Sequence, residues 1–274
     1  MPELPEVETI RRQLGDVVTG HMVVDAWAHP SERFSEATDV VGARLGSVRR
    51  RGKYLLVDVE RDRGRDEMVV HLGMTGSLRP LDVLDHLPPD DPYVRAAWRY
   101  ADGGGLVYRD IRRFGRIAVV DPGSYERLPT LASLGPEPFD DTFDAEHVWR
   151  AMRGGRRRVK TRLLDQRMVA GVGNIYADEA LWRAGINPAR RSVTRAEAAR
   201  LVDAVRQVLA EGIEHGGTTL RDYVGVDGSQ GANQHRLQCY GRVGLPCPRC
   251  GTVLRKRVID GRASTYCPSC QPSR

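Results

Sequence analysis

Hydrophobic residues near the start of the chain recur at helical spacing. Leu4, Val7, Ile10 and Leu14 are three or four positions apart, so they fall on one face of a helix. Pro5 suits the first turn of that helix, because the amide hydrogen that proline lacks has no partner there. The pattern predicts an amphipathic helix that packs against the rest of the protein.

Short β-rich runs replace this helical spacing from about Val23 to Val120. Within them, Gly103-Gly104-Gly105 supplies the permissive backbone of a hairpin turn. The pattern predicts a strand-rich domain with the amino-terminal helix packed on it. The clearest predicted strands are Tyr54–Val59, Met68–Leu72, Leu106–Tyr108 and Arg116–Val120.

A helical pattern returns in the second half of the chain. It follows Asp121–Phe139, whose four prolines indicate a hinge between domains. Thr194 and Glu197 form a capping box that opens the longest predicted helix. The glycine-rich segment Gly216–Gln234 is expected to be mobile. The predicted helices are Asp144–Met152, Lys160–Arg167, Asn174–Ala184 and Thr194–His215.

The composition is that of a globular protein. A length of 274 residues fits two domains, and the chain is 41% hydrophobic and 28% charged. A chain of this length can bury enough surface to fold without disulfides. No hydrophobic run approaches the roughly 18 residues that a membrane span needs, and the acidic start lacks the pattern of a signal peptide. We therefore expect a cytoplasmic protein with reduced thiols and no membrane partner.

Basic residues cluster in two places, although the net charge is only +6. Seven basic residues and no acidic residue lie between Arg150 and Arg162. Between Arg236 and Arg274 there are eight basic residues and one acid, Asp260. Such clusters are typical of a surface that binds a polyanion. The alternative is a solvated face or, for the second cluster, a disordered tail.

All five cysteines lie in the last 36 residues. Cys247 and Cys250 form one C-x2-C pair, and Cys267 and Cys270 form a second pair after 16 intervening residues. Four thiolates at this spacing are typical of a closed structural zinc site, which leaves no open position for catalysis. A redox pair or disulfides are the alternatives. Cys239 is expected to be a small packed residue.

The residues between the two cysteine pairs predict a β-hairpin. Thr252–Val258 and Arg262–Tyr266 are the two short strands, and Asp260-Gly261 is the turn that joins them.

The start of the chain carries a candidate nucleophile. Removal of Met1 would give Pro2 a secondary amine, whose pKa near ~8 leaves more neutral amine at pH 7 than a lysine has. Attack of this amine on an aldehyde gives an iminium ion, which is a good electron sink. Glu3 lies beside Pro2, and Glu6 lies one turn further on. The alternative is a helix that starts with proline and carries acids at the positive end of its dipole.

Several motifs, taken in order, resemble those of the bacterial formamidopyrimidine-DNA glycosylase family. The resemblance runs from Pro2 to about Gln271 and therefore covers essentially the whole chain. The motifs are Pro2–Thr9, Arg51–Tyr54, His71–Gly76, Asp110–Gly115, Gly171–Tyr176 and the cysteine hairpin.

The resemblance implies an α+β protein with two domains that acts as a monomer. The first domain is a β-sandwich that carries a catalytic amino-terminal helix. The second is a helix–two-turns–helix domain with a zinc-finger β-hairpin. The implied boundaries are 1–121 for the sandwich, 122–139 for the hinge, 140–235 for the helical domain and 236–274 for the four-cysteine zinc finger.

The resemblance also implies a bifunctional base-excision-repair enzyme that acts on double-stranded DNA with oxidised bases or abasic sites. In that family the amine at Pro2 attacks C1′ of the sugar, displaces an oxidised purine and forms a Schiff base. Glu3 is the acid that helps the sugar to open, and Lys53 assists β-elimination. Arg262 assists δ-elimination and grips phosphate. One structural Zn²⁺, held by the four paired cysteines, is the implied cofactor.

The family fills the space left by the extruded base with three residues, which match Met74, Arg112 and Phe114. Glycines that flank these residues favour tight exposed loops over core positions. The segment Gly225–Gln234 matches the family's lesion-capping loop. Further DNA contacts implied by the resemblance are Glu6, Arg156, Lys160 and Asn174.

The chain departs from the family at one point. Asp90-Asp91-Pro92-Tyr93 stands where the family often carries a Lys-His-x-His stretch that touches DNA. Because an acid cannot replace a cation at a phosphate, this DNA contact is not expected here.

Two other functions remain open from the sequence. An endonuclease VIII type of enzyme shares Pro2, Glu3 and Lys53 but prefers oxidised pyrimidines, whereas the set formed by Met74, Arg112 and Phe114 favours the purine enzyme. A non-catalytic binder of damaged DNA would be expected to have lost Pro2 or Glu3, and both are present.

Overall fold

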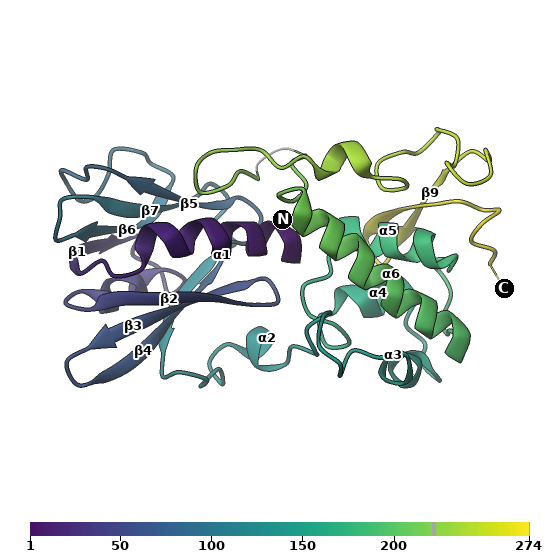
Figure 1. Ribbon diagram of the computed structural model, residues 1–274, viewed down its shortest axis with the longest axis horizontal. Coiled ribbons are helices and arrows are strands. Elements are labelled where there is room, and N and C mark those ends of the chain that lie inside the picture. The colour runs from purple at the N-terminus through teal and green to yellow at the C-terminus, as the bar shows by residue number, and fades with distance from the viewer. Residues whose placement is uncertain (221–222, 274) are drawn as a thin grey trace. The chain divides into compact units, whose positions relative to one another are not determined.

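The computed structural model describes residues 1–220 and 223–273, which form two units (Figure 1). The first unit combines Met1–Ala132 with Gly216–Ala232, and the second combines Ser133–His215 with Asn233–Arg274. The segment Gly216–Ala232 therefore belongs with the amino-terminal part of the chain, whereas the sequence placed it in the helical domain. The predicted mobility of this segment falls partly on residues 221 and 222, which lie outside the described residues.

The first unit is a sandwich of two four-stranded sheets whose paired strands are all antiparallel. One sheet has the order β1 (Val23–Ala28), β6 (Val94–Tyr100), β7 (Gly105–Asp110) and β5 (Gly76–Leu81). The other has the order β2 (Arg44–Arg51), β3 (Tyr54–Arg61), β4 (Gly64–His71) and β8 (Arg116–Val120). A short 3-10 helix, η1 (Ser35–Val40), lies between β1 and β2 in the chain.

The core of this unit is continuous with one face of α1 (Leu4–Val18), which lies against β2 and β3 (Figure 1). Val7, Ile10 and Leu14 are at most 1% exposed, as their spacing predicted. Full burial of each such side chain contributes about 1.5–3 kcal/mol to folding. The structure confirms the predicted helix and extends it by one more turn, because Val18 joins the same core.

Short connections and helices follow the sandwich. A one-turn helix, α2 (Pro129–Ala132), ends the first part of the chain. The second unit contains α3 (Ala145–Met152), α4 (Val159–Leu164), α5 (Asn174–Ala184) and α6 (Arg195–Glu214), followed by η2 (Asn233–Arg236), β9 (Arg255–Ile259) and β10 (Arg262–Tyr266). Helix α6 packs against both α3 and α5. Among the described residues, none of the helices has both the length and the hydrophobicity to cross a bilayer.

Two predicted boundaries are corrected by local geometry. Helix α4 ends at Leu164 rather than at residue 167, because Gln166 takes a left-handed backbone with φ of +65°. Strand β9 begins at Arg255 rather than at residue 252, because Val253 forms a separate bridge with Pro246. The capping box at the start of α6 is confirmed, with both of its hydrogen bonds present.

Two glycines give opposite predictions for an added methyl group. In α1, a Cβ on Gly15 would meet no atom within 4 Å, so Gly15→Ala should stabilise the protein by about 0.4–1 kcal/mol through the unfolded state. A Cβ on Gly115 would lie 1.8 Å from the hydroxyl of Tyr108 and 2.7 Å from the carbonyl oxygen of His71. Gly115→Ala should therefore destabilise by about 1–3 kcal/mol.

Thermal unfolding of the two variants and the parent protein checks this prediction. We expect the midpoint to rise for Gly15→Ala and to fall for Gly115→Ala. Equal midpoints would contradict the close packing around Gly115.

Candidate active site and metal centre

The start of α1 is held by a reciprocal capping box between Glu3 and Glu6. The backbone amide of Glu3 donates to Oε2 of Glu6 at 2.8 Å. Oε1 of Glu6 accepts a second backbone amide, that of Thr218, at 2.7 Å. Both carboxylates are buried, and Pro2 beside them is buried as well. Glu6 therefore fixes Pro2 and Glu3 in place through backbone amides, and its contact with DNA stays a prediction.

The segment that Glu6 binds is attached to α1 at further points. The hydroxyl of Tyr223 donates to the carbonyl oxygen of Glu6 at 3.4 Å, and the amide of Val226 donates to Oε1 of Gln13 at 2.8 Å. These bonds explain why the glycine-rich segment belongs to the first unit. A carboxylate and an amide on α1 hold a segment that lies more than 200 positions later in the sequence.

Lys53 lies directly after Gly52, whose φ of +55° makes the turn between β2 and β3. Lys53 is only 6% exposed. Burial and the nearby ammonium of Lys53 lower the pKa of His71 to about 4. His71 is therefore neutral at physiological pH, and its Nδ1 can accept the amide of Gly73 at 3.3 Å. The turn that carries Lys53 is thus close to the start of the Met74 loop.

Asp110 joins the two loops that carry Met74, Arg112 and Phe114. Its side chain is fully buried, and it accepts the hydroxyl of Thr75 at 2.5 Å and the amide of Gly115 at 2.8 Å. The hydroxyl of Thr75 in turn accepts the amide of Arg112 at 3.1 Å.

The same two loops leave their large side chains exposed. Met74 is 36% exposed and Phe114 is 50% exposed, as their flanking glycines predicted. The guanidinium of Arg112 lies 4.9 Å from the centre of the Phe114 ring. The backbones are also in close contact, since a Cβ on Gly73 would lie 2.5 Å from backbone atoms of Phe114 and Gly115. A rigid double loop that exposes apolar side chains to water is suited to insertion into another molecule.

Asp91, which lies in the loop that departs from the family pattern, is paired with other groups of the protein. Asp91 accepts Nε of Arg109 at 2.7 Å and the amide of Tyr93 at 2.8 Å. The guanidinium of Arg109 also lies 4.8 Å from the centre of the Tyr93 ring. Partial burial alone would raise the pKa of Asp91, but the amide of Tyr93 and the cation of Arg109 lower it. Asp91 thus stays ionised and is balanced by Arg109.

In the second unit, three of the predicted DNA contacts are accessible. Arg156 and Arg262 are exposed, and Asn174 is half-buried at the first position of α5. Asn174 donates from Nδ2 to the carbonyl oxygen of Ala263 at 3.3 Å. This places Asn174 and the strand that carries Arg262 side by side.

Lys160 is paired inside the second unit. Its side chain is 1% exposed, and Nζ forms an ion pair with Oδ1 of Asp178 at 2.6 Å. Nζ also donates to the carbonyl oxygen of Ala263 at 2.9 Å. Burial raises the pKa of Asp178 to about 6, and the ammonium of Lys160 opposes that rise. Nζ of Lys160 is therefore engaged inside the protein, and the contact of Lys160 with DNA stays a prediction.

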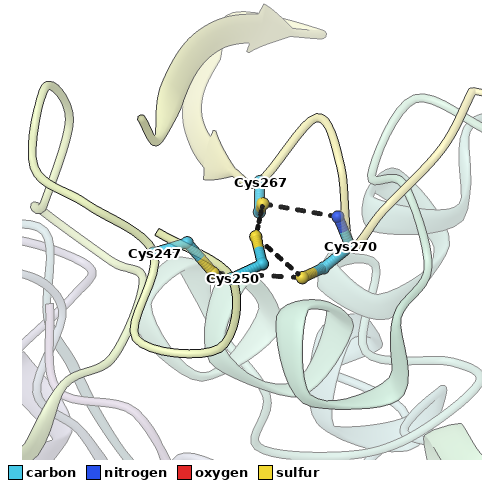
Figure 2. A group of neighbouring side chains, drawn as sticks. All are labelled: Cys247, Cys250, Cys267 and Cys270. Atoms are coloured by element: carbon cyan, nitrogen blue, oxygen red, sulfur yellow. Dashed lines mark hydrogen bonds between the residues drawn. The ribbon is translucent and has the colours of Figure 1, made fainter. Parts of the chain in front are cut away.

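Figure 2 shows the four paired cysteines converging on one point. Their sulfur atoms all lie within 4.8 Å of one another, with Sγ of Cys250 at 3.5 Å from that of Cys267 and 3.4 Å from that of Cys270. Four thiolates around one Zn²⁺ at ~2.3 Å would lie roughly 3.8 Å apart, so the sulfur set fits a tetrahedral zinc ion. Trp182 of α5 adds an indole hydrogen bond to Sγ of Cys247 at 3.4 Å.

Cys239 is a packed residue, as predicted. It is fully buried, lies outside the sulfur cluster, and donates to the carbonyl oxygen of Thr265 at 3.1 Å. Burial raises the pKa of its thiol well above the ordinary range.

Sequence reasoning missed the buried carboxylates that organise the site. Asp178 and Glu179 lie next to each other in α5, and both are buried. Glu179 accepts the backbone amides of Gln238, Cys239 and Tyr240 at 2.7–3.0 Å. Two adjacent acids inside a helix of small and apolar residues are unusual, and that local composition was the available signal.

Comparison with known proteins gives one consistent result. Three protein-family profiles match the chain: the formamidopyrimidine-DNA glycosylase N-terminal domain over residues 1–117, the formamidopyrimidine-DNA glycosylase H2TH domain over 134–224, and the zinc finger found in FPG and IleRS over 244–272. The formamidopyrimidine-DNA glycosylase of Thermus thermophilus is 46% identical, over 99% of this chain and 98% of that protein. The one from Deinococcus radiodurans is 42% identical, over 100% and 98%.

Solved structures give the same match. The crystal structure of the MutM (Fpg) protein from Thermus thermophilus superimposes with a TM-score of 0.89 at 45% identity, covering all of both chains. A Lactococcus lactis Fpg mutant in complex with Fapy-dG-containing DNA gives a TM-score of 0.88 at 33% identity, covering 99% of this chain and 100% of that chain.

Metal removal should unfold the hairpin and leave the sandwich intact, because the core of the first unit contains none of these cysteines. We expect one zinc ion per chain by metal analysis. Its removal by a chelator should unfold the hairpin and let trypsin cleave at Arg255–Arg257, which are already exposed, while residues 1–132 resist cleavage. Cys250→Ala should lose the metal, whereas Cys239→Ala should keep it. Zinc retained by Cys250→Ala would contradict the assignment.

Proposed function

The chain belongs to the formamidopyrimidine-DNA glycosylase family, and on that premise we propose that it excises oxidised purines from duplex DNA and nicks the resulting abasic site. Its substrates are double-stranded DNA with 8-oxoguanine or formamidopyrimidines. The observation that carries the proposal is the intact pair of Pro2 and Glu3 at the capped start of α1 in a chain that matches the family over its full length. The four cysteines hold one structural zinc ion.

Pro2 acts as the nucleophile once Met1 has been removed. The secondary amine attacks C1′ of the damaged nucleotide, forming an N–C1′ bond while the bond from C1′ to the base breaks, and the proton that the amine loses neutralises the departing base. Glu3 supplies the proton that the ring oxygen of the sugar needs as it opens. The product is an iminium ion that links Pro2 to the DNA. The capping box supports this step because it holds both residues at a fixed helix start.

The iminium ion then drives strand cleavage. Loss of a proton from C2′ sends an electron pair toward the iminium nitrogen, and the bond from C3′ to its phosphate breaks in the β-elimination. Loss of a proton from C4′ then drives a second elimination, which breaks the bond from C5′ to its phosphate. Lys53 assists the first elimination and Arg262 the second, where its guanidinium can pair with the departing phosphate.

The double loop stabilises DNA from which the damaged base has been extruded. Met74 is the apolar wedge, Arg112 pairs with the orphaned base, and Phe114 stacks on the neighbouring base pair. Exposure of Met74 and Phe114 on a loop fixed by Asp110 supports this role. Arg156 and Asn174 contact phosphates from the second unit.

The place of action follows from the substrate. We propose that the enzyme works as a single chain in the bacterial cytoplasm and associates with the nucleoid when it acts on DNA.

Arg112→Ala should weaken binding to a lesion duplex by about 1–3 kcal/mol, as expected for the loss of a charged contact to a base. The loss should depend on the base opposite the lesion and should be smaller for undamaged DNA. Titration of both duplexes measures this difference. Arg63→Ala, in the exposed turn between β3 and β4, is the matched control and should bind both duplexes like the parent. Equal losses on the two duplexes would make Arg112 only a phosphate contact.

Glu3→Gln should separate the two steps of the reaction. The amide keeps the size of the side chain but cannot give up a proton, so excision of 8-oxoguanine should fall by about 10²–10⁴-fold. A ready-made abasic site already offers an aldehyde, so the variant should still form a covalent complex there. Borohydride trapping on the two substrates measures both steps.

The same trapping assay tests the nucleophile and the substrate class. A chain with a blocked amino terminus should form no covalent complex, and Pro2→Gly should keep partial activity through its own terminal amine. A complex that survives blocking would move the nucleophile to a lysine, with Lys53 the first candidate. Cleavage of a thymine glycol duplex in preference to an 8-oxoguanine duplex would favour the endonuclease VIII type.

A further inference from the structure

Arg262 lies at the tip of a small hairpin that cannot fix its own direction. Arg262 opens β10 and pairs with Ile259 across the turn formed by Asp260 and Gly261. Both turn residues have left-handed backbones, with φ of +46° and +78°. An isolated two-stranded hairpin is only marginally stable in water. Contacts with the helices must therefore set the direction of the tip.

Two consecutive residues of α4 hold the chain on both sides of Arg262. The hydroxyl of Thr161 donates to Oδ2 of Asp260, two residues before Arg262. Nζ of Lys160 donates at 2.9 Å to the carbonyl oxygen of Ala263, the residue after Arg262. The arginine is thus bracketed by two bonds that come from one helical turn.

Helix α5 completes this arrangement through Asp178. Oδ1 of Asp178 pairs with Nζ of Lys160 at 2.6 Å, and Oδ2 accepts the amide of Thr265 at 2.8 Å. The side chains of the pair are 1% and 0% exposed. Burying an ion pair is costly unless its geometry and remaining hydrogen bonds are good, and loss of one partner leaves the other charge uncompensated. Here both oxygens of Asp178 are used, and one of them holds β10.

We propose that Lys160, Thr161 and Asp178 form a clamp that positions Arg262 for the second elimination. This proposal rests on the proposed function only because that function assigns the second elimination to Arg262. Asn174 donates to the same carbonyl oxygen of Ala263, so the clamp also sets the spacing between Arg262 and the start of α5. None of the three clamp residues touches the reacting atoms, and their effect is transmitted through the backbone of residues 260–265.

Thr161→Val tests the clamp with the least disturbance, because valine has the shape of threonine without the hydroxyl. On an abasic-site duplex under single-turnover conditions, the variant should slow the second elimination about three- to tenfold, as expected for the loss of one hydrogen bond. The β-elimination product should then accumulate. Borohydride trapping and zinc content should match the parent, because Pro2, Glu3 and the cysteines are untouched. Thr161→Ser, which keeps the hydroxyl, should restore the parent product ratio.

Asp178→Asn is the second variant. It keeps the size of the side chain and an oxygen for the amide of Thr265, but it removes the charge that pairs with Lys160. We expect the same accumulation of the β-elimination product, with a larger effect than in Thr161→Val. The same trapping and zinc measurements show whether the variant is folded.

A double-mutant cycle with Arg262→Gln decides whether the effect passes through Arg262. Arg262→Gln alone should slow the second elimination, and adding Thr161→Val to it should have no further effect. The clamp is overturned if Thr161→Val leaves the product ratio unchanged while Arg262→Gln alters it, or if its effect persists in the Arg262→Gln background. A parent ratio in Arg262→Gln alone would overturn the role of Arg262 and the clamp with it. A parent protein that neither nicks nor traps would overturn the proposed function itself.

Discussion

Glu6 uses its two carboxylate oxygens to bind the backbone amides of Glu3 and Thr218, at 2.8 and 2.7 Å. Chain termini usually fray, and a nucleophile placed at a terminus would then have no fixed position. The capping box attaches Pro2 to a helix whose other face is part of the sandwich core, so the proposed nucleophile inherits the rigidity of that core. The same carboxylate holds the segment that follows α6. The position of the proposed nucleophile therefore depends on one buried acid.

Other functional segments are held by the same kind of bond. Asp110 binds the amide of Gly115, Asp178 binds that of Thr265, and Glu179 binds the amides of three consecutive residues in 238–240. Hydrogen bonds to a charged group contribute about 1.5–3 kcal/mol, and an unpaired buried carboxylate costs more than that. A loop bonded in this way has few alternative conformations. That restriction allows Met74 and Phe114 to stay exposed without collapsing onto the protein.

The features that were predicted correctly are those that depend on the spacing of nearby residues in the sequence. The hydrophobic face of α1, the capping box of α6 and the four zinc-binding cysteines all follow from local patterns, and the structure has each of them. The sequence could not show contacts that depend on a distant partner. Lys160 lies in a run of seven basic residues and was taken for a DNA contact, yet Asp178 draws it into the core. The end of α4 was also predicted wrongly. Gln166 adopts a left-handed backbone there, and the sequence has no glycine at that position to indicate it.

The acidic loop at Asp91 departs from the family pattern but keeps its connection to the double loop. Arg109 neutralises Asp91, whereas Asp90 in the same loop is exposed and lies beside His86. The backbone of the loop keeps its connection to the double loop, because the carbonyl oxygen of Tyr93 accepts the amide of Asp110 at 2.9 Å. Asp110 in turn binds Thr75 and Gly115, which organise the segments that carry Met74 and Phe114. The loop thus lacks the cations of the family pattern but keeps the backbone support on which the double loop depends.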